Sequence, residues 1–134
     1  MKKLDSICII DDDPITLFGI KKILSNVVVC KTISTYKNGK LAIDDIKFNL
    51  EKVGNIPQII FLDINMPIMD GWQFLAQFIK LPITQKVRIN IVTSSIDIAD
   101  RERWEYYKTR THHLITFNNK PIKKEEISQI TEVP

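Results

Sequence analysis

Short, continuous runs of apolar residues alternate along the chain with longer segments in which apolar residues recur at helical spacing. Continuous runs predict strands buried on both faces, as in a parallel sheet. We predict strands at 7–10, 27–30, 59–62, 87–92 and 114–117. Spacings of three and four residues predict amphipathic helices. We predict helices from Pro14 through Leu24, over 39–50, from Trp72 to Ile79, over 98–109 and over 123–131.

Regular alternation of strand and helix predicts an α/β fold, with a parallel sheet that carries helices on both faces. Right-handed crossovers and short connections limit the topology to a few doubly wound strand orders. The chain has 134 residues and shows no internal repeat or linker. We therefore expect one domain over 1–134, with no output domain attached.

Composition and charge exclude several classes of protein. The chain is 44% hydrophobic and 26% charged, as is usual for soluble globular proteins. Its net charge of +3 comes from scattered residues, which argues against direct DNA binding. No apolar run approaches the length of a transmembrane helix, and the polar N-terminus does not resemble a signal peptide. Cys8 and Cys30 lie in apolar runs and are expected to be buried, reduced thiols of a cytoplasmic protein.

Acidic residues follow two of the predicted strands. Asp63 comes directly after 59–62, where by itself it could simply cap a loop. Asp11, Asp12 and Asp13 follow the first strand, and Asp13 is well placed as the N-cap of a helix that begins at Pro14. Capping needs only one acid, and three adjacent carboxylates repel each other. The excess of acids therefore favours a bound cation.

Four predicted strands end in polar residues. Asp11 and Asp12 follow the first, Asp63 the third, Thr93 the fourth and Lys120 the fifth. The carboxyl ends of parallel strands meet at one edge of a sheet, where open α/β sheets place their ligands. This convergence is more specific than any of the short motifs alone.

Four motifs in this order resemble the receiver domain of two-component response regulators, the CheY-like family. They are Ile-Ile-Asp-Asp-Asp-Pro (9–14), Leu-Asp-Ile-Asn-Met-Pro-Ile-Met-Asp-Gly (62–71), Ile-Val-Thr-Ser-Ser (91–95) and Asn-Lys-Pro (119–121). The resemblance spans nearly the whole chain. It implies a flavodoxin-like, five-stranded sheet in the order 2-1-3-4-5.

The resemblance also implies a role for each site residue. Asp63 would be the phosphoacceptor, and Lys120 the lysine of the site, preceding Pro121 through a cis peptide bond. Thr93 and Phe117 would be the switch residues. The expected Mg²⁺ ligands, with Mn²⁺ as a possible substitute, are Asp11, Asp12, Asp63 and the backbone carbonyl of Asn65.

The chemistry of these residue types agrees with that expectation. An ionised aspartate is a nucleophile that can form an aspartyl phosphate. Phosphoryl transfer depends mainly on positioning and charge neutralisation, which Mg²⁺ with oxygen ligands and a lysine point charge can supply. Thr93 can donate one hydrogen bond to a phosphoryl oxygen. Ser94 is small enough to leave Asp63 accessible.

Two stretches depart from the family pattern. The loop around 51–57 is longer than usual, and Thr109 to His113 replaces the common Gly-Ala turn before the fifth strand. We expect the adjacent pair His112-His113 to lie in a solvated loop, because two histidines without other ligands are a weak motif.

The leading hypothesis is a signalling module that takes phosphate from a histidine kinase or a phosphotransfer protein and then binds an output protein. It would not be an enzyme in the usual sense, because it would catalyse only its own phosphorylation and dephosphorylation. One alternative is a receiver fragment of a larger response regulator or hybrid kinase. Less favoured are a phosphatase of the haloacid dehalogenase type, which would need an acid at Asn65, and a flavin carrier, which would need a phosphate loop after the first strand.

Overall fold

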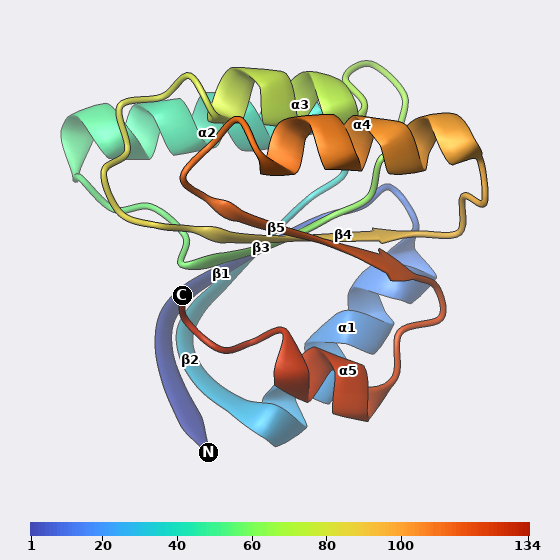
Figure 1. Cartoon of the computed structure of the whole chain (residues 1–134). Helices are drawn as coiled ribbons and strands as arrows, with labels where there is room; N and C mark the ends of the chain where they lie inside the picture. Colours follow the sequence, from blue (N-terminus) through green and yellow to red (C-terminus); the bar gives the residue numbers. More distant parts are fainter.

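Five strands and five helices alternate along the computed structural model, which describes residues 1–134 (Figure 1). Their bounds are β1 (Lys2–Ile10), α1 (Pro14–Val27), β2 (Val28–Tyr36), α2 (Gly39–Lys52), β3 (Ile59–Leu62), α3 (Gly71–Phe78), β4 (Arg88–Thr93), α4 (Ile98–Lys108), β5 (Leu114–Asn119) and α5 (Lys124–Gln129). All strand pairs are parallel, in the order β2-β1-β3-β4-β5. The predicted α/β fold and strand order are confirmed.

The sheet separates two hydrophobic cores. Helices α2, α3 and α4 cover one face, and α1 and α5 cover the other (Figure 1). Successive strand residues point to opposite faces. Cys8 and Ile10 of β1 therefore enter the core under α2 and α3, whereas Ile7 and Ile9 enter the core above α1 and α5. This is why residues 7–10 of β1 and the whole of β3 are continuous apolar runs.

Four helices begin with a side-chain cap close to the carboxyl ends of the strands. Asp13, Asn38, Asp70 and Asp97 each accept a hydrogen bond from a backbone N–H in the first turn that follows. Such caps satisfy donors that a helix would otherwise leave unpaired. The predicted cap at Asp13, with Pro14 at the first helical position, is confirmed.

The strands at the sheet edge are longer than predicted. Strand β2 continues to Tyr36 rather than ending at Cys30, and pairs with β1 along its whole length. Lys31, Thr32 and Ser34 interrupt its apolar run, because an edge strand is covered less completely than a central one. Cys30 is accordingly only half-buried, whereas Cys8 is buried as expected, and both cysteines are free.

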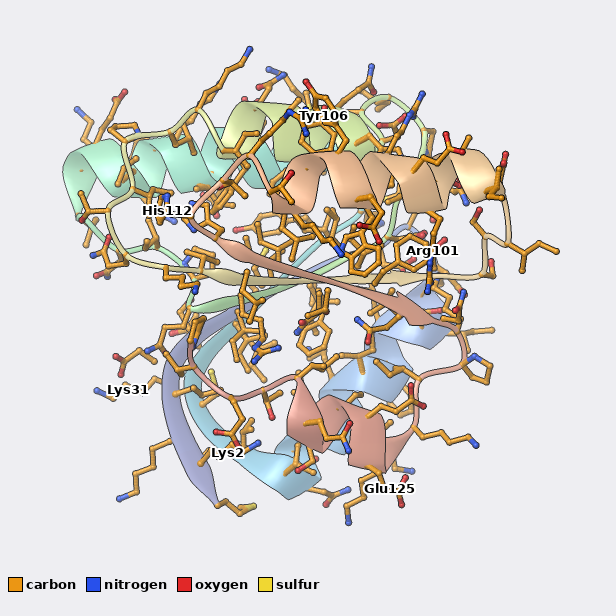
Figure 2. All side chains as sticks on the ribbon, in the orientation of Figure 1. Lys2, Lys31, Arg101, Tyr106, His112 and Glu125 are labelled. Atoms are coloured by element: carbon orange, nitrogen blue, oxygen red, sulfur yellow. The ribbon has the colours of Figure 1, made fainter.

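The expectation of a solvated His112-His113 loop is wrong for the second histidine. His112 lies exposed beside the start of β5 (Figure 2), but His113 is only 3% exposed. Its Nδ1 accepts a hydrogen bond of 3.0 Å from the backbone N–H of Val87, and its ring packs against Phe78. Burial lowers the pKa of His113 to about 4, so the ring is neutral at neutral pH. His113 is thus part of the core at the amino end of β5.

None of the helices has both the length and the apolar character that crossing a membrane requires.

Candidate functional site

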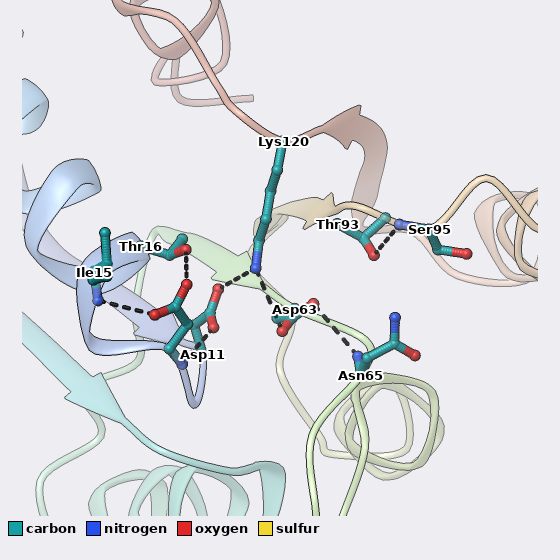
Figure 3. Close-up of polar contacts among 9 residues, drawn as sticks. Asp11, Ile15, Thr16, Asp63, Asn65, Thr93, Ser95 and Lys120 are labelled. Carbon is teal, nitrogen blue, oxygen red and sulfur yellow. Dashed lines mark hydrogen bonds and ion pairs between the residues drawn. The ribbon is translucent and has the colours of Figure 1, made fainter.

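Three acids that follow two strands meet at the carboxyl edge of the sheet, and Figure 3 shows two of them, Asp11 and Asp63. Asp11 and Asp12 follow β1, and Asp63 follows β3. Their carboxylate groups offer oxygens that all lie within 4.8 Å of one another. Asp11 and Asp63 are buried, and Asp12 is exposed. The predicted convergence of the acids is therefore present.

Backbone hydrogen bonds fix the strand ends that carry these side chains. The N–H of Asp63 donates to the carbonyl of Ile10 at 2.9 Å, which ties the end of β3 to that of β1. The N–H of Lys120 donates to the carbonyl of Thr93, also at 2.9 Å. The parallel ladders thus continue to the site, so its geometry is set by rigid sheet backbone rather than by free loops.

Lys120 reaches across the site from the end of β5. Its Nζ lies 3.0 Å from Asp11 Oδ2 and 3.6 Å from Asp63 Oδ2, and its side chain is largely buried (Figure 3). The Lys120–Pro121 peptide bond is cis, as expected. One ammonium group therefore serves two buried carboxylates.

The electrostatic balance of the site remains negative. Burial and then the negative charge of Asp11 raise the pKa of Asp63 to about 6, although Lys120 acts in the opposite direction. Burial by itself would lower the pKa of Lys120, but its contacts with Asp11 and Asp63 outweigh burial and raise it. A single lysine cannot neutralise three acids. Binding of a further cation would neutralise the remaining negative charge.

The donor set fits a hard divalent cation. Mg²⁺ prefers oxygen ligands and usually binds to one or two carboxylates while keeping several waters. The cluster offers carboxylate oxygens only, and it lies partly open to solvent through Asp12. Soft metals would need sulfur or imidazole ligands, which are absent from this cluster.

Thr93 and Phe117 lie on the neighbouring strands β4 and β5. Thr93 is fully buried, and its Oγ1 accepts a hydrogen bond of 3.1 Å from the N–H of Ser95. The hydroxyl hydrogen of Thr93 is thereby left available as a donor. Phe117 is half-buried against Trp104, with ring centroids 5.8 Å apart, and the guanidinium of Arg101 lies 5.2 Å from the centre of the Phe117 ring.

Two contributors near the site were not recognised from the sequence. Gly71, in a motif typical of a turn, leaves room for the Asp63 backbone: a Cβ at this position would lie 2.4 Å from the Asp63 carbonyl oxygen. The helical spacing of Trp72 indicates a core residue only, yet its indole N–H donates to Asp100. A buried indole usually needs a hydrogen-bond acceptor, and this is the signal that could have prompted a search for one.

A cleft lies at the opposite, amino edge of the sheet. It has a volume of about 790 Å³, and its lining includes Lys31, Asn55, Gln58 and Lys86. It contains none of the residues that converge at the carboxyl edge, so it is separate from the candidate site.

Comparison with known proteins agrees with the geometry. A family model described as the response regulator receiver domain matches residues 7–132. The protein-glutamate methylesterase/protein-glutamine glutaminase of Methanococcoides burtonii is 30% identical over 122 residues, covering 91% of this chain and 31% of that protein. A protein of the same name, numbered 2, from Methanospirillum hungatei is 30% identical over 118 residues, covering 86% of this chain and 30% of that protein. The chain thus spans about a third of the length of these relatives.

Solved structures show the same fold. A two-component response regulator from Cytophaga hutchinsonii superposes with a TM-score of 0.80 at 27% identity, covering 96% of this chain and 95% of that one. The phosphorylated cyanobacterial phytochrome response regulator RcpA superposes with a TM-score of 0.74 at 22% identity, covering 94% of this chain and 87% of that one.

Proposed function

Because this chain belongs to the response regulator receiver domain family, we propose that Asp63 is the phosphoacceptor of a two-component signalling pathway. The observation that carries the proposal is the meeting of Asp11, Asp12, Asp63 and Lys120 at one edge of the sheet. The same fold occurs in proteins with many unrelated activities, so the proposal depends on these side chains rather than on the fold.

The proposed reaction is an in-line phosphoryl transfer. A carboxylate oxygen of Asp63 attacks the phosphorus of a phosphohistidine on the donor protein. The P–O bond to Asp63 forms while the P–N bond breaks, and the imidazole leaves with its electron pair. Asp63 must be ionised to attack, and its pKa of about 6 leaves most molecules ionised at neutral pH.

Asp11, Asp12, Asp63 and the backbone carbonyl of Asn65 would hold Mg²⁺, or Mn²⁺ in its place. The cation would neutralise charge on the phosphoryl oxygens, as in other phosphoryl transfer sites. Lys120 already contacts Asp63 and would move its ammonium group to a phosphoryl oxygen.

We propose that Thr93 and Phe117 convert this modification into altered partner binding. A phosphoryl group on Asp63 offers strong acceptors, and the hydroxyl of Thr93 has a hydrogen free to donate. Movement of Thr93 toward Asp63 would leave space beside β4, which Phe117 of the next strand can fill. The surface around Trp104 would change with it.

The proposed partners are a histidine kinase or phosphotransfer protein on one side and an output protein on the other, all in the cytoplasm. Ile15, Ile68 and Ile96 are largely exposed in segments that follow β1, β3 and β4. They belong to the same carboxyl edge as the acids. A phosphodonor protein would cover such apolar residues when it presents its histidine to Asp63.

A second possibility is that the chain is the receiver part of a longer response regulator or hybrid kinase. The two methylesterase relatives described above are about three times longer than the matched region, and that observation favours this alternative. In either case the catalysis proposed for these residues is limited to their own phosphorylation and dephosphorylation.

Incubation with acetyl phosphate and Mg²⁺, followed by intact-protein mass spectrometry, tests the function. We expect one phosphoryl group on the wild-type protein, and none on Asp63→Asn or on wild type in EDTA. Asp44→Asn is a matched control, because Asp44 is an exposed acid on α2 paired with Lys40. Labelling of Asp63→Asn at the wild-type level would refute the assignment.

A further inference from the structure

The carboxylate of Asp100, in the first turn of α4, joins two parts of the molecule. Its Oδ2 accepts a hydrogen bond of 2.6 Å from the hydroxyl of Ser95, in the segment between β4 and α4. Its Oδ1 accepts a hydrogen bond of 2.9 Å from the indole N–H of Trp72 on α3. The two oxygens of Asp100 therefore bind two different parts of the chain, the β4–α4 segment and helix α3.

Ser95 in turn connects Asp100 to the candidate site. Its backbone N–H donates to Thr93 Oγ1 at 3.1 Å, and its backbone carbonyl accepts from the Asn119 side chain at 3.3 Å. Its Oγ also accepts from the N–H of Asp97, the N-cap of α4, at 3.2 Å. A displacement of the Thr93 hydroxyl must therefore either break its bond with Ser95 or move Ser95 with it.

The other end of the chain of contacts reaches the surface. Trp72 is buried and stacks on Tyr107 of α4, with ring centroids 5.9 Å apart and planes within 13° of parallel. Tyr107 meets Tyr106 edge to face at 5.2 Å. Tyr106 is exposed and is labelled on α4 in Figure 2. The contacts thus run from Thr93 through Ser95, Asp100 and Trp72 to the seam between α3 and α4.

We infer that Asp100 is a positioning residue that couples the state of Thr93 to the seam between α3 and α4. This route is separate from the one through Phe117, which lies on β5 and contacts Trp104. The inference rests on the proposed function, because phosphorylation of Asp63 is what moves Thr93. The conformational shift that this route can transmit is limited by how differently the phosphoryl group contacts the two states of Thr93.

The two tryptophans of the chain report the two routes independently. The indole N–H of Trp72 is bonded to Asp100, whereas that of Trp104 is bonded to the carbonyl of Ile115 on β5, also at 2.9 Å. The experiment is to record both indole N–H resonances in ¹H–¹⁵N NMR spectra, with Mg²⁺, before and after adding beryllofluoride as a phosphoryl mimic. Both signals should shift in the wild-type protein.

In Asp100→Asn we expect beryllofluoride to bind as before, the Trp104 signal to shift as in wild type, and the Trp72 signal to lose most of its shift. Ser95→Ala should have the same effect, and the double variant should lose no more than either single one, because both changes interrupt one path. Glu102→Gln, a neutralised exposed acid two residues further along α4, is the matched control and should respond like wild type.

The outcomes separate the two proposals. If the wild-type protein does not bind beryllofluoride in Mg²⁺, the proposed function fails and this inference fails with it. If it binds but Trp72 does not shift, or if Asp100→Asn and Ser95→Ala keep the full Trp72 shift, only the coupling role of Asp100 is refuted.

Discussion

The ammonium group of Lys120 is closer to Asp11 than to Asp63: 3.0 Å from Asp11 Oδ2 and 3.6 Å from Asp63 Oδ2. In the proposed reaction Asp11 binds a metal and Lys120 binds phosphate. Because Lys120 already pairs with one oxygen of Asp11, the lysine and the metal would compete for the negative charge of the same carboxylate.

Lys120→Met should raise the affinity of the unphosphorylated protein for Mg²⁺. Removing a positive charge next to Asp11 and Asp63 strengthens cation binding, here by about tenfold, or about 1.4 kcal/mol. The measurement is Mg²⁺ titration at constant ionic strength. Lys123→Met, at an exposed lysine just before α5, should leave the affinity unchanged. A weaker affinity in Lys120→Met would show that the competition does not exist.

Asp63→Asn should stabilise the metal-free protein at neutral pH. Asp63 has a pKa of about 6 when folded, against its ordinary 3.8, so the folded state holds the proton more tightly than the unfolded state. Its ionisation destabilises the fold, with no effect below pH about 4 and the full effect, about 1–3 kcal/mol, above pH about 6. Urea unfolding in EDTA at several pH values measures this. A wild-type protein more stable than Asp63→Asn at neutral pH would contradict it.

Thr93→Ala should still accept a phosphoryl group on Asp63 but lose much of the response at Phe117. The alanine cannot donate a hydrogen bond to the phosphoryl oxygens, so nothing draws β4 toward Asp63. NMR shifts of β5 and α4, with and without beryllofluoride, give the readout. If Thr93→Ala shows the complete wild-type shift pattern, the signal reaches Phe117 by another route.

His113→Phe should cost about 1–2 kcal/mol of stability at neutral pH, because the buried N–H of Val87 loses its acceptor. Burial holds the pKa of His113 at about 4, below its ordinary 6.5, so wild type loses stability as the pH falls from about 6.5 toward 4. The variant should lack that part of the pH dependence. His112→Phe, at the exposed neighbour, should retain it. Denaturant titrations across this pH range distinguish the two.

Gly71→Ala should destabilise the fold by about 1–3 kcal/mol, since the added methyl group overlaps the backbone at Asp63. Gly19, inside α1, offers the opposite case, because a methyl group added there would meet no atom within 4 Å. Gly19→Ala should therefore stabilise by about 0.5–1 kcal/mol through helix propensity. Thermal or urea unfolding of both variants tests the contrast.

The sequence predicts the central part of this molecule well because burial there is complete. The strand at 59–62 has the predicted bounds, and the polar residues at the strand ends meet because parallel strands share an edge. Polar residues within β2 concealed its length. The burial of His113 was not predicted because a single polar residue in a core leaves no periodic signal in the sequence. The contacts of Asp100 could not be predicted from the sequence, because they depend on how α4 packs against α3.

Helix α4 spans 11 residues and has no buried side chain; only Trp104 and Tyr107 pack against the edge of the core. Substitutions on its outer side are therefore nearly free of the packing constraints that hold the strands. After gene duplication, two copies of such a domain can diverge at this helix and acquire different partners while sharing one chemistry. The same freedom makes the outer side of α4 the natural surface to redesign when a receiver is engineered to bind a new partner.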